Sequence, residues 1–105
     1  MNVLLSGGYG FIGGHLARAL TESGHSYYVA CRHVPIPRDS HQFDICVNLI
    51  RPATITDAVR TSLAIRRLGI PTILASSTAC DGWPTSQYAL AKRVQELLTR
   101  GCILR

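Results

Sequence analysis

The sequence predicts an α/β fold in which a doubly wound parallel sheet of four to five strands carries three helices. Two observations predict it. Short apolar runs alternate along the chain with longer segments in which apolar residues recur at helical spacing. A glycine-rich segment stands between the first apolar run and the first helical segment. This alternation predicts right-handed crossovers, helices on both faces of the sheet, and ligand binding at the carboxyl ends of the strands.

The first half of the chain is expected to hold two strands and the helix between them. Residues 3–5 are a short apolar run that ends in glycines, which is typical of a buried parallel strand. Residues 11–23 predict a helix that Gly24 ends. Its apolar side chains at helical spacing are Ile12, Leu16, Ala19 and Leu20. Residues 27–31 form the second strand, and the prolines and histidines of residues 33–43 predict a loop.

The second half repeats the alternation of strand and helix. Strands are expected at residues 44–50, 71–76 and 102–104, with helices at 54–68 and 86–100. In the first of these helices the residues on or near one face are Ile55, Ala58, Val59, Ser62, Leu63 and Ile65. In the second helix the residues expected to point inward are Leu90, Ala91, Val94, Leu97 and Leu98. One domain spanning residues 1–105 accounts for all of these elements.

The glycine-rich segment has the spacing of a phosphate-binding loop. Glycines at positions 7, 10 and 13 give the pattern G-x-x-G-x-x-G. A pyrophosphate requires a tight turn, close approach of the backbone and free N–H groups at a helix N-terminus. Glycine provides the first two, and the helix that begins at Phe11 and Ile12 provides the third. We also expect Gly13 to let this helix pack closely on the strand. A minimal Rossmann-like NAD(P) site is therefore predicted, the alternative being a purely structural glycine turn.

The end of the second expected strand indicates which dinucleotide is preferred. An acidic side chain at that point accepts a hydrogen bond from the 2′-hydroxyl of NAD, whereas an arginine accommodates the 2′-phosphate of NADP. This chain has Cys31 followed by Arg32, and no carboxylate before Asp39. The sequence therefore favours NADP, with NAD as the second choice. The alternative is that Arg32 is simply a solvated residue at a strand end.

A tyrosine and a lysine stand four residues apart in the last expected helix. The segment Tyr88-Ala89-Leu90-Ala91-Lys92 places both side chains on one helical face. A phenol is a poor acid or base at neutral pH, and an ammonium beside it stabilises the phenolate, which makes proton transfer easier. The preceding strand ends in Ser76-Ser77-Thr78, which offers a hydroxyl to a substrate carbonyl. The order of glycine loop, hydroxyl-bearing strand end and Tyr/Lys pair predicts an active site.

These segments together resemble the extended branch of the short-chain dehydrogenase/reductase superfamily, which holds NAD-dependent epimerases and dehydratases. The resemblance covers nearly the whole chain in order. It rests on residues 6–15, Ser76-Ser77-Thr78, Tyr88 with Lys92, and the closing Ile103-Leu104-Arg105.

The resemblance implies a role for each matching residue. Tyr88 corresponds to the general acid/base, and Lys92 corresponds both to the partner that lowers its pKa and to a ligand of the cofactor ribose. Thr78 matches the family's catalytic serine or threonine. The residues that match the cofactor loop are Gly7, Gly10, Phe11, Ile12 and Gly13, with Arg32 as the reader of the 2′-phosphate.

Relative to this family, the chain is strongly shortened. The family has a helix, a strand and usually another helix where this chain has only the loop between Arg32 and Asp44. The expected sheet order is therefore 27–31, 3–5, 44–50 and 71–76, with 102–104 outermost. In addition, the small residues that usually stand beside the cofactor in this family are replaced here by Leu49-Ile50-Arg51-Pro52. The bulk of Ile50 or the charge of Arg51 is expected either to obstruct the cofactor or to contact its phosphates.

Three functions are consistent with these residues. The first is an NADP-dependent oxidoreductase that transfers a hydride to or from a small carbonyl, alcohol or sugar-nucleotide substrate. The second is a non-catalytic NAD(P)-binding or regulatory module, and the third is an inactive fragment of an epimerase/dehydratase-like protein. We favour the enzyme, because a binding module would need only the lysine of the Tyr/Lys pair.

The remaining expectations concern partners and location. Relatives commonly dimerise through the helices that correspond to residues 54–68 and 86–100, so a homodimer or higher homo-oligomer is expected. The charge of +5 favours anionic partners such as phosphates, but the scattered arginines argue against nucleic acid. The chain shows no signal peptide and no apolar segment long enough to cross a membrane. The four cysteines have no metal-site spacing, and we expect reduced core thiols in a cytoplasmic protein.

Overall fold

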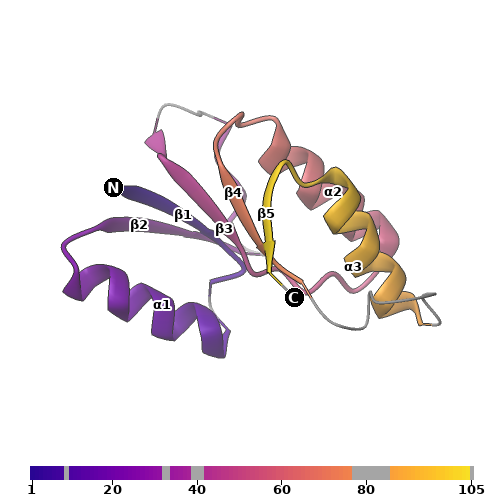
Figure 1. Ribbon diagram of the computed structural model, residues 1–105, viewed down its shortest axis with the longest axis horizontal. Helices are drawn as coiled ribbons and strands as arrows, with labels where there is room; N and C mark the ends of the chain where they lie inside the picture. The colour runs from indigo at the N-terminus through magenta and orange to yellow at the C-terminus, as the bar shows by residue number, and fades with distance from the viewer. Residues whose placement is uncertain (9, 32–33, 39–41, 77–85, 105) are drawn as a thin grey trace.

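The computed structural model describes residues 1–8, 10–31, 34–38, 42–76 and 86–104. This part of the chain forms a five-stranded sheet with three helices (Figure 1). In chain order the elements are β1 (Asn2–Ser6), α1 (Phe11–Glu22), β2 (Ser26–Ala30), β3 (Ile45–Asn48), α2 (Ile55–Arg66), β4 (Thr72–Ala75), α3 (Gln87–Leu98) and β5 (Gly101–Leu104). The predicted Rossmann-like α/β fold class is confirmed, with small shifts at the ends of the elements.

The strands are all parallel and follow the order β2-β1-β3-β4-β5. This is the order expected from the sequence. Strand β1 lies between β2 and β3, with Ser6 in register with both Ala30 and Asn48. The carboxyl ends of these three strands therefore meet at one edge of the sheet. Helix α1 lies on one face, and α2 and α3 pack against each other on the opposite face (Figure 1).

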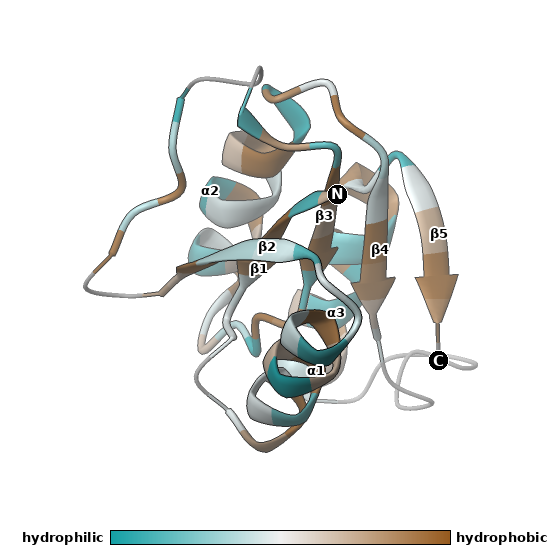
Figure 2. Ribbon diagram, turned by 90° about the vertical axis from the view of Figure 1, so that its left-hand side faces the viewer, coloured by the Kyte–Doolittle hydropathy of each residue, from teal (hydrophilic) through white to brown (hydrophobic). Residues whose placement is uncertain are grey.

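The hydrophobic core centres on the inner strands. The side chains of Leu4 and Leu5 on β1 are fully buried, as is Cys46 on β3. One cluster joins these strands to α2 and to the loop after β2; it contains Leu4, Ala30, Phe43, Cys46, Ile65 and Leu68. Figure 2 shows β1 and β3 as largely hydrophobic. Burial raises the pKa of the Cys46 thiol to about 12, so this thiol is a protonated core residue, as expected. Cys102 is exposed on the edge strand β5, so the expectation of a buried thiol is wrong there.

Helices α1 and α3 bury different residues from those that the sequence pattern predicts. In α1 only Gly13 is buried, while Ile12 is 64% exposed. In α3 the expectation is wrong for Leu97, which is 72% exposed, and for Leu90, which is 40% exposed. The buried residues of α3 are Ala89, Ala91, Lys92 and Gln95. The reason is that α3 lies over backbone carbonyls that need hydrogen-bond donors, and an apolar face supplies none.

None of the helices in the described ranges is long and apolar enough to cross a membrane.

Candidate functional site

A groove of about 680 Å³ opens at the carboxyl edge of the sheet. Ser6, Gly7 and Gly10 line it from the end of β1 and the loop that follows. The segment after β2 contributes Cys31, Pro35, Ile36 and Arg38. The opposite wall is residues 49–53 after β3 and the side of α2 with Asp57, Arg60, Thr61 and Ala64. This is the position at which doubly wound folds bind their ligands.

Two of the predicted glycines allow close backbone approach around this groove. Gly7 has a φ of +79°, and a Cβ at this position would lie 2.9 Å from the backbone nitrogen of Ile50. Its N–H donates to the carbonyl of Ala30 at 2.7 Å, which ties the loop to β2. A Cβ at Gly13 would overlap the backbone carbonyl of Gly8. The close packing expected of Gly13 therefore exists, but its partner is the loop directly after β1 and not the strand itself.

The N-terminus of α1 is free to bind an anion. Its N-cap, Gly10, has extended backbone angles and makes no side-chain capping bond. By contrast, Thr54 caps α2 and Ser86 caps α3 through their hydroxyls. The N–H groups in the first turn of α1, which begins with Phe11 and Ile12, have no acceptor within the helix. The positive end of the helix dipole and these donors suit a phosphate.

Ser6 adds a polar group at the floor of the groove. This residue has no exposed surface, and its hydroxyl has no hydrogen-bond partner in the described part of the chain. A buried hydroxyl without a partner costs free energy, and the Ser62 hydroxyl and the Gln95 side-chain oxygen are unpartnered in the same way among the described residues. The groups at this edge that suit the pyrophosphate of a dinucleotide are the Gly7 turn and the open N-terminus of α1.

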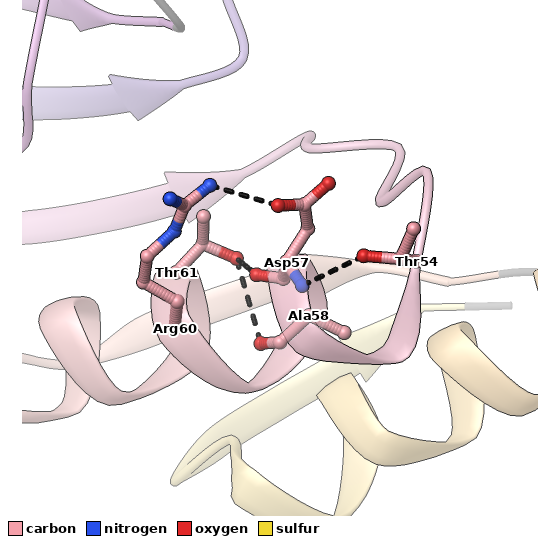
Figure 3. A network of polar contacts seen from close by, with 5 residues as sticks. All are labelled: Thr54, Asp57, Ala58, Arg60 and Thr61. Carbon is pink, nitrogen blue, oxygen red and sulfur yellow. Dashed lines mark hydrogen bonds and ion pairs between the residues drawn. The ribbon is translucent and has the colours of Figure 1, made fainter.

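A network at the start of α2 holds the polar wall of the groove (Figure 3). The hydroxyl of Thr54 accepts from the N–H of Asp57 at 3.1 Å. The Asp57 carboxylate pairs with Arg60 at 2.8 Å, and Thr61 donates to the Asp57 carbonyl at 2.8 Å. The Arg60 side chain is 74% exposed, so this ion pair lies at the surface beside the groove.

The Tyr88 and Lys92 side chains have different environments. Tyr88 is half-buried, and the guanidinium carbon of Arg51 lies 5.7 Å from the centre of its ring. Lys92 is 3% exposed, and its ammonium donates to the carbonyls of Ile50 and Ala75, both at 3.0 Å. Gln95 donates to the same Ile50 carbonyl at 3.2 Å. Lys92 therefore joins the ends of β3 and β4 beneath α3.

Two predicted site residues, Arg32 and Thr78, lie outside the described residues. The structure adds several residues that the sequence reasoning did not single out: Ser6, Arg38, Asn48, Arg60 and Gln95. Ser6 and Asn48 had a usable signal, since each is a polar residue at the end of an apolar strand. Gln95 and Arg60 had no such signal in the sequence. Glutamine and arginine are common on the exposed faces of helices, so neither residue stands out by its type.

The geometry defines a Rossmann-like α/β fold, and comparison with solved structures supports this. No protein-family model matches the chain, and neither does any curated protein sequence. An NAD-dependent NDP-hexosamine 5,6-dehydratase involved in tunicamycin biosynthesis superposes with a TM-score of 0.77 at 22% identity, over 93% of this chain and 48% of its own.

Two further structures show the same likeness. A human epimerase family protein with NADPH has a TM-score of 0.72 at 17% identity, over 96% of this chain and 49% of its own. A short-chain dehydrogenase/reductase superfamily protein from Agrobacterium tumefaciens with bound NAD has a TM-score of 0.70 at 17% identity, over 93% of this chain and 44% of its own. The chain thus spans about half the length of these proteins. The resemblance drawn from the sequence is confirmed at the level of the fold, which is that of the short-chain dehydrogenase/reductase epimerases and dehydratases.

Proposed function

We propose that this chain binds NADP(H) and acts as an oxidoreductase of the short-chain dehydrogenase/reductase type. The observation that carries the proposal is the groove at the carboxyl edge, where the Gly7 turn and the uncapped N-terminus of α1 meet. The substrate class is a small carbonyl or alcohol, or a sugar nucleotide. We place the reaction in the cytoplasm, where thiols such as Cys46 stay reduced.

The proposed preference for NADP over NAD rests on two positively charged residues that line the groove. Arg38 lines the groove beside Cys31, and Arg60 faces it from α2. Arginine binds phosphate through several N–H donors, so both residues suit a 2′-phosphate. Arg32, which the sequence analysis proposed as the residue that binds the 2′-phosphate, follows β2 in the sequence.

Bound NADPH supplies the hydride for reduction of a carbonyl. The residues of this chain then have three tasks. The N-terminus of α1 binds the pyrophosphate, Arg38 and Arg60 bind the 2′-phosphate, and the Tyr88 hydroxyl gives a proton to the carbonyl oxygen as it takes up negative charge. Thr78 is proposed to orient that oxygen.

A non-catalytic NAD(P)-binding module is the second candidate. It draws support from Lys92, whose ammonium is bonded to the Ile50 and Ala75 carbonyls. A lysine held in this way stabilises the fold whether or not a reaction occurs. Its presence is therefore also consistent with a module that binds the nucleotide without turnover.

Titration with NADPH and with NADH, followed by nicotinamide fluorescence, tests cofactor binding. We expect micromolar affinity for NADPH and weaker affinity for NADH. Arg38→Ala should reduce the preference for NADPH by about tenfold, the value of one charged phosphate contact. Arg18→Ala, an exposed arginine of α1 outside the groove lining, is the matched control and should leave the preference unchanged.

Turnover with small aldehydes and ketones separates the two candidates. Tyr88→Phe should abolish turnover and leave NADPH affinity unchanged. Cofactor binding without turnover on any carbonyl would favour the module. If neither nucleotide binds at millimolar concentration, both candidates are wrong.

We also propose a homodimer that forms through the outer faces of α2 and α3. Three exposed hydrophobic residues support it: Ile55 on α2, and Leu90 and Leu97 on α3. Leu90 and Leu97 are two turns apart and therefore share one face of their helix. Single exposed apolar side chains are common on protein surfaces, so the proposal depends on these three lying on the paired helices.

A further inference from the structure

Arg51 occupies an unusual position between the groove and Tyr88. It is separated from the end of β3 by Leu49 and Ile50, and it is exposed and lines the groove. Its guanidinium carbon lies 5.7 Å from the centre of the Tyr88 ring, within the range of a cation–π contact. Tyr88 itself comes from α3, so Arg51 is the side chain that joins the groove to the proposed proton donor.

The backbone that carries Arg51 is held by three buried side chains. The N–H of Ile50 donates to the Asn48 side-chain oxygen at 3.1 Å. The carbonyl of Ile50, which belongs to the peptide bond with Arg51, accepts from Lys92 at 3.0 Å and from Gln95 at 3.2 Å. Asn48, Lys92 and Gln95 are 1%, 3% and 0% exposed. Arg51 therefore projects from a preorganised turn and not from a loose loop, which lowers the entropy lost when it binds a ligand.

The charge on Arg51 is not neutralised within the described part of the chain. Four charged residues of that part line the groove: Arg38, Arg51, Asp57 and Arg60. Asp57 is paired with Arg60 at 2.8 Å, whereas Arg51 makes no ion pair with any described residue. An anchored guanidinium with an uncompensated charge attracts a carboxylate or a phosphate, which it binds through parallel N–H donors.

We propose that Arg51 is a specificity-determining residue that binds an anionic group on the substrate, next to Tyr88. This inference rests on the proposed function, because it concerns the substrate of the same site. A phosphate of the cofactor is the other source of an anion. The substrate is favoured because Arg51 contacts Tyr88, where the carbonyl must lie, whereas the pyrophosphate already has the uncapped end of α1. The substrates selected are therefore carbonyl compounds that carry a carboxylate or a phosphate.

Binding of a matched pair of small molecules tests the inference without requiring turnover. Benzoate and benzamide have nearly the same shape and differ in charge. Calorimetry on the wild-type chain, with and without saturating NADPH, should give tighter binding of benzoate. Arg51→Met should remove this difference and leave benzamide unchanged, while Arg51→Lys, which keeps the charge, should retain part of it. Because Arg51 is exposed, we expect both variants to fold, which circular dichroism checks.

Turnover of 4-carboxybenzaldehyde and of its neutral amide gives the second arm of the test. Arg51→Met should lower kcat/KM for the carboxylate by about 10- to 100-fold and change kcat/KM for the amide by less than about twofold. NADPH affinity should stay constant. Benzoate binding that depends on Arg51 without turnover of either aldehyde would support the inference and count against the oxidoreductase.

Three results would overturn the inference. Equal losses on both aldehydes would mean that Arg51 only positions Tyr88. Weaker NADPH binding with an unchanged charge preference would assign the anion to the cofactor. No change in either binding or turnover would leave Arg51 as a surface residue stacked on Tyr88.

Discussion

Single residues decide how closely the backbone can approach a ligand at the groove. Gly13 and Gly14 are neighbours on α1, yet their surroundings differ. A Cβ at Gly13 would overlap the carbonyl of Gly8, whereas a Cβ at Gly14 would meet nothing within 4 Å. The loop that carries Gly7 and Gly10 therefore depends on one glycine of this pair and not on the other.

Gly13→Ala should weaken NADPH binding by about tenfold or more, because the added methyl group must displace either α1 or the phosphate loop. Gly14→Ala is the control and should stabilise the helix slightly, by about 0.5–1 kcal/mol. Fluorescence titration and thermal unfolding measure the two effects. Equal NADPH affinity in the Gly13 and Gly14 variants would show that the close contact does not shape the site.

At the scale of elements, α3 links the ends of β3 and β4 through hydrogen bonds from its buried polar side chains. Its buried face presents Lys92 and Gln95 to the carbonyls of Ile50 on one strand end and Ala75 on the next. These hydrogen bonds give donors to the carbonyl of Ala75, the last residue of β4, and to the carbonyl of Ile50, which lies beyond the end of β3. The lysine of the Tyr/Lys pair thus has a structural task in addition to the role that the family resemblance implies for it.

Lys92→Met should lower the free energy of unfolding by about 1–3 kcal/mol, since it removes the donor to the Ala75 carbonyl and one of two donors to the Ile50 carbonyl. Arg93→Met, at the next and exposed position of α3, should change stability by less than about 0.5 kcal/mol. Urea unfolding compares the two variants. Similar stabilities would mean that the lysine has no role in bracing the sheet.

At the scale of the whole molecule, the two faces of the sheet are covered unequally. Helices α2 and α3 lie side by side on one face, and α1 lies against the β2 side of the other (Figure 1). The outer surface of the α2–α3 pair still exposes Ile55, Leu90 and Leu97. Burial of such side chains contributes roughly 25 cal/mol per Å² of apolar surface, which favours association through that surface.

Leu97→Glu should therefore convert a homodimer into a monomer, because it would place a carboxylate within the apolar contact. Light scattering at micromolar concentration measures the mass. Tyr27→Glu, an exposed position on the edge strand β2, is the control and should leave the dimer intact. A monomeric wild-type chain, or a Leu97→Glu variant with unchanged mass, would refute the proposed interface.

The sequence by itself determined the order and type of the elements, the parallel sheet and the glycine turn between β1 and α1. These depend on local properties: short apolar runs, apolar residues at helical spacing, and glycines at a strand-to-helix junction. The tertiary structure alone decided which faces of α1 and α3 are buried, because that depends on what each helix meets. Leu97 looked like a core residue by spacing, yet the helix turns Lys92 and Gln95 inward to reach a carbonyl more than forty residues earlier. The same long-range contacts set Arg51 beside Tyr88, a juxtaposition that no local pattern encodes.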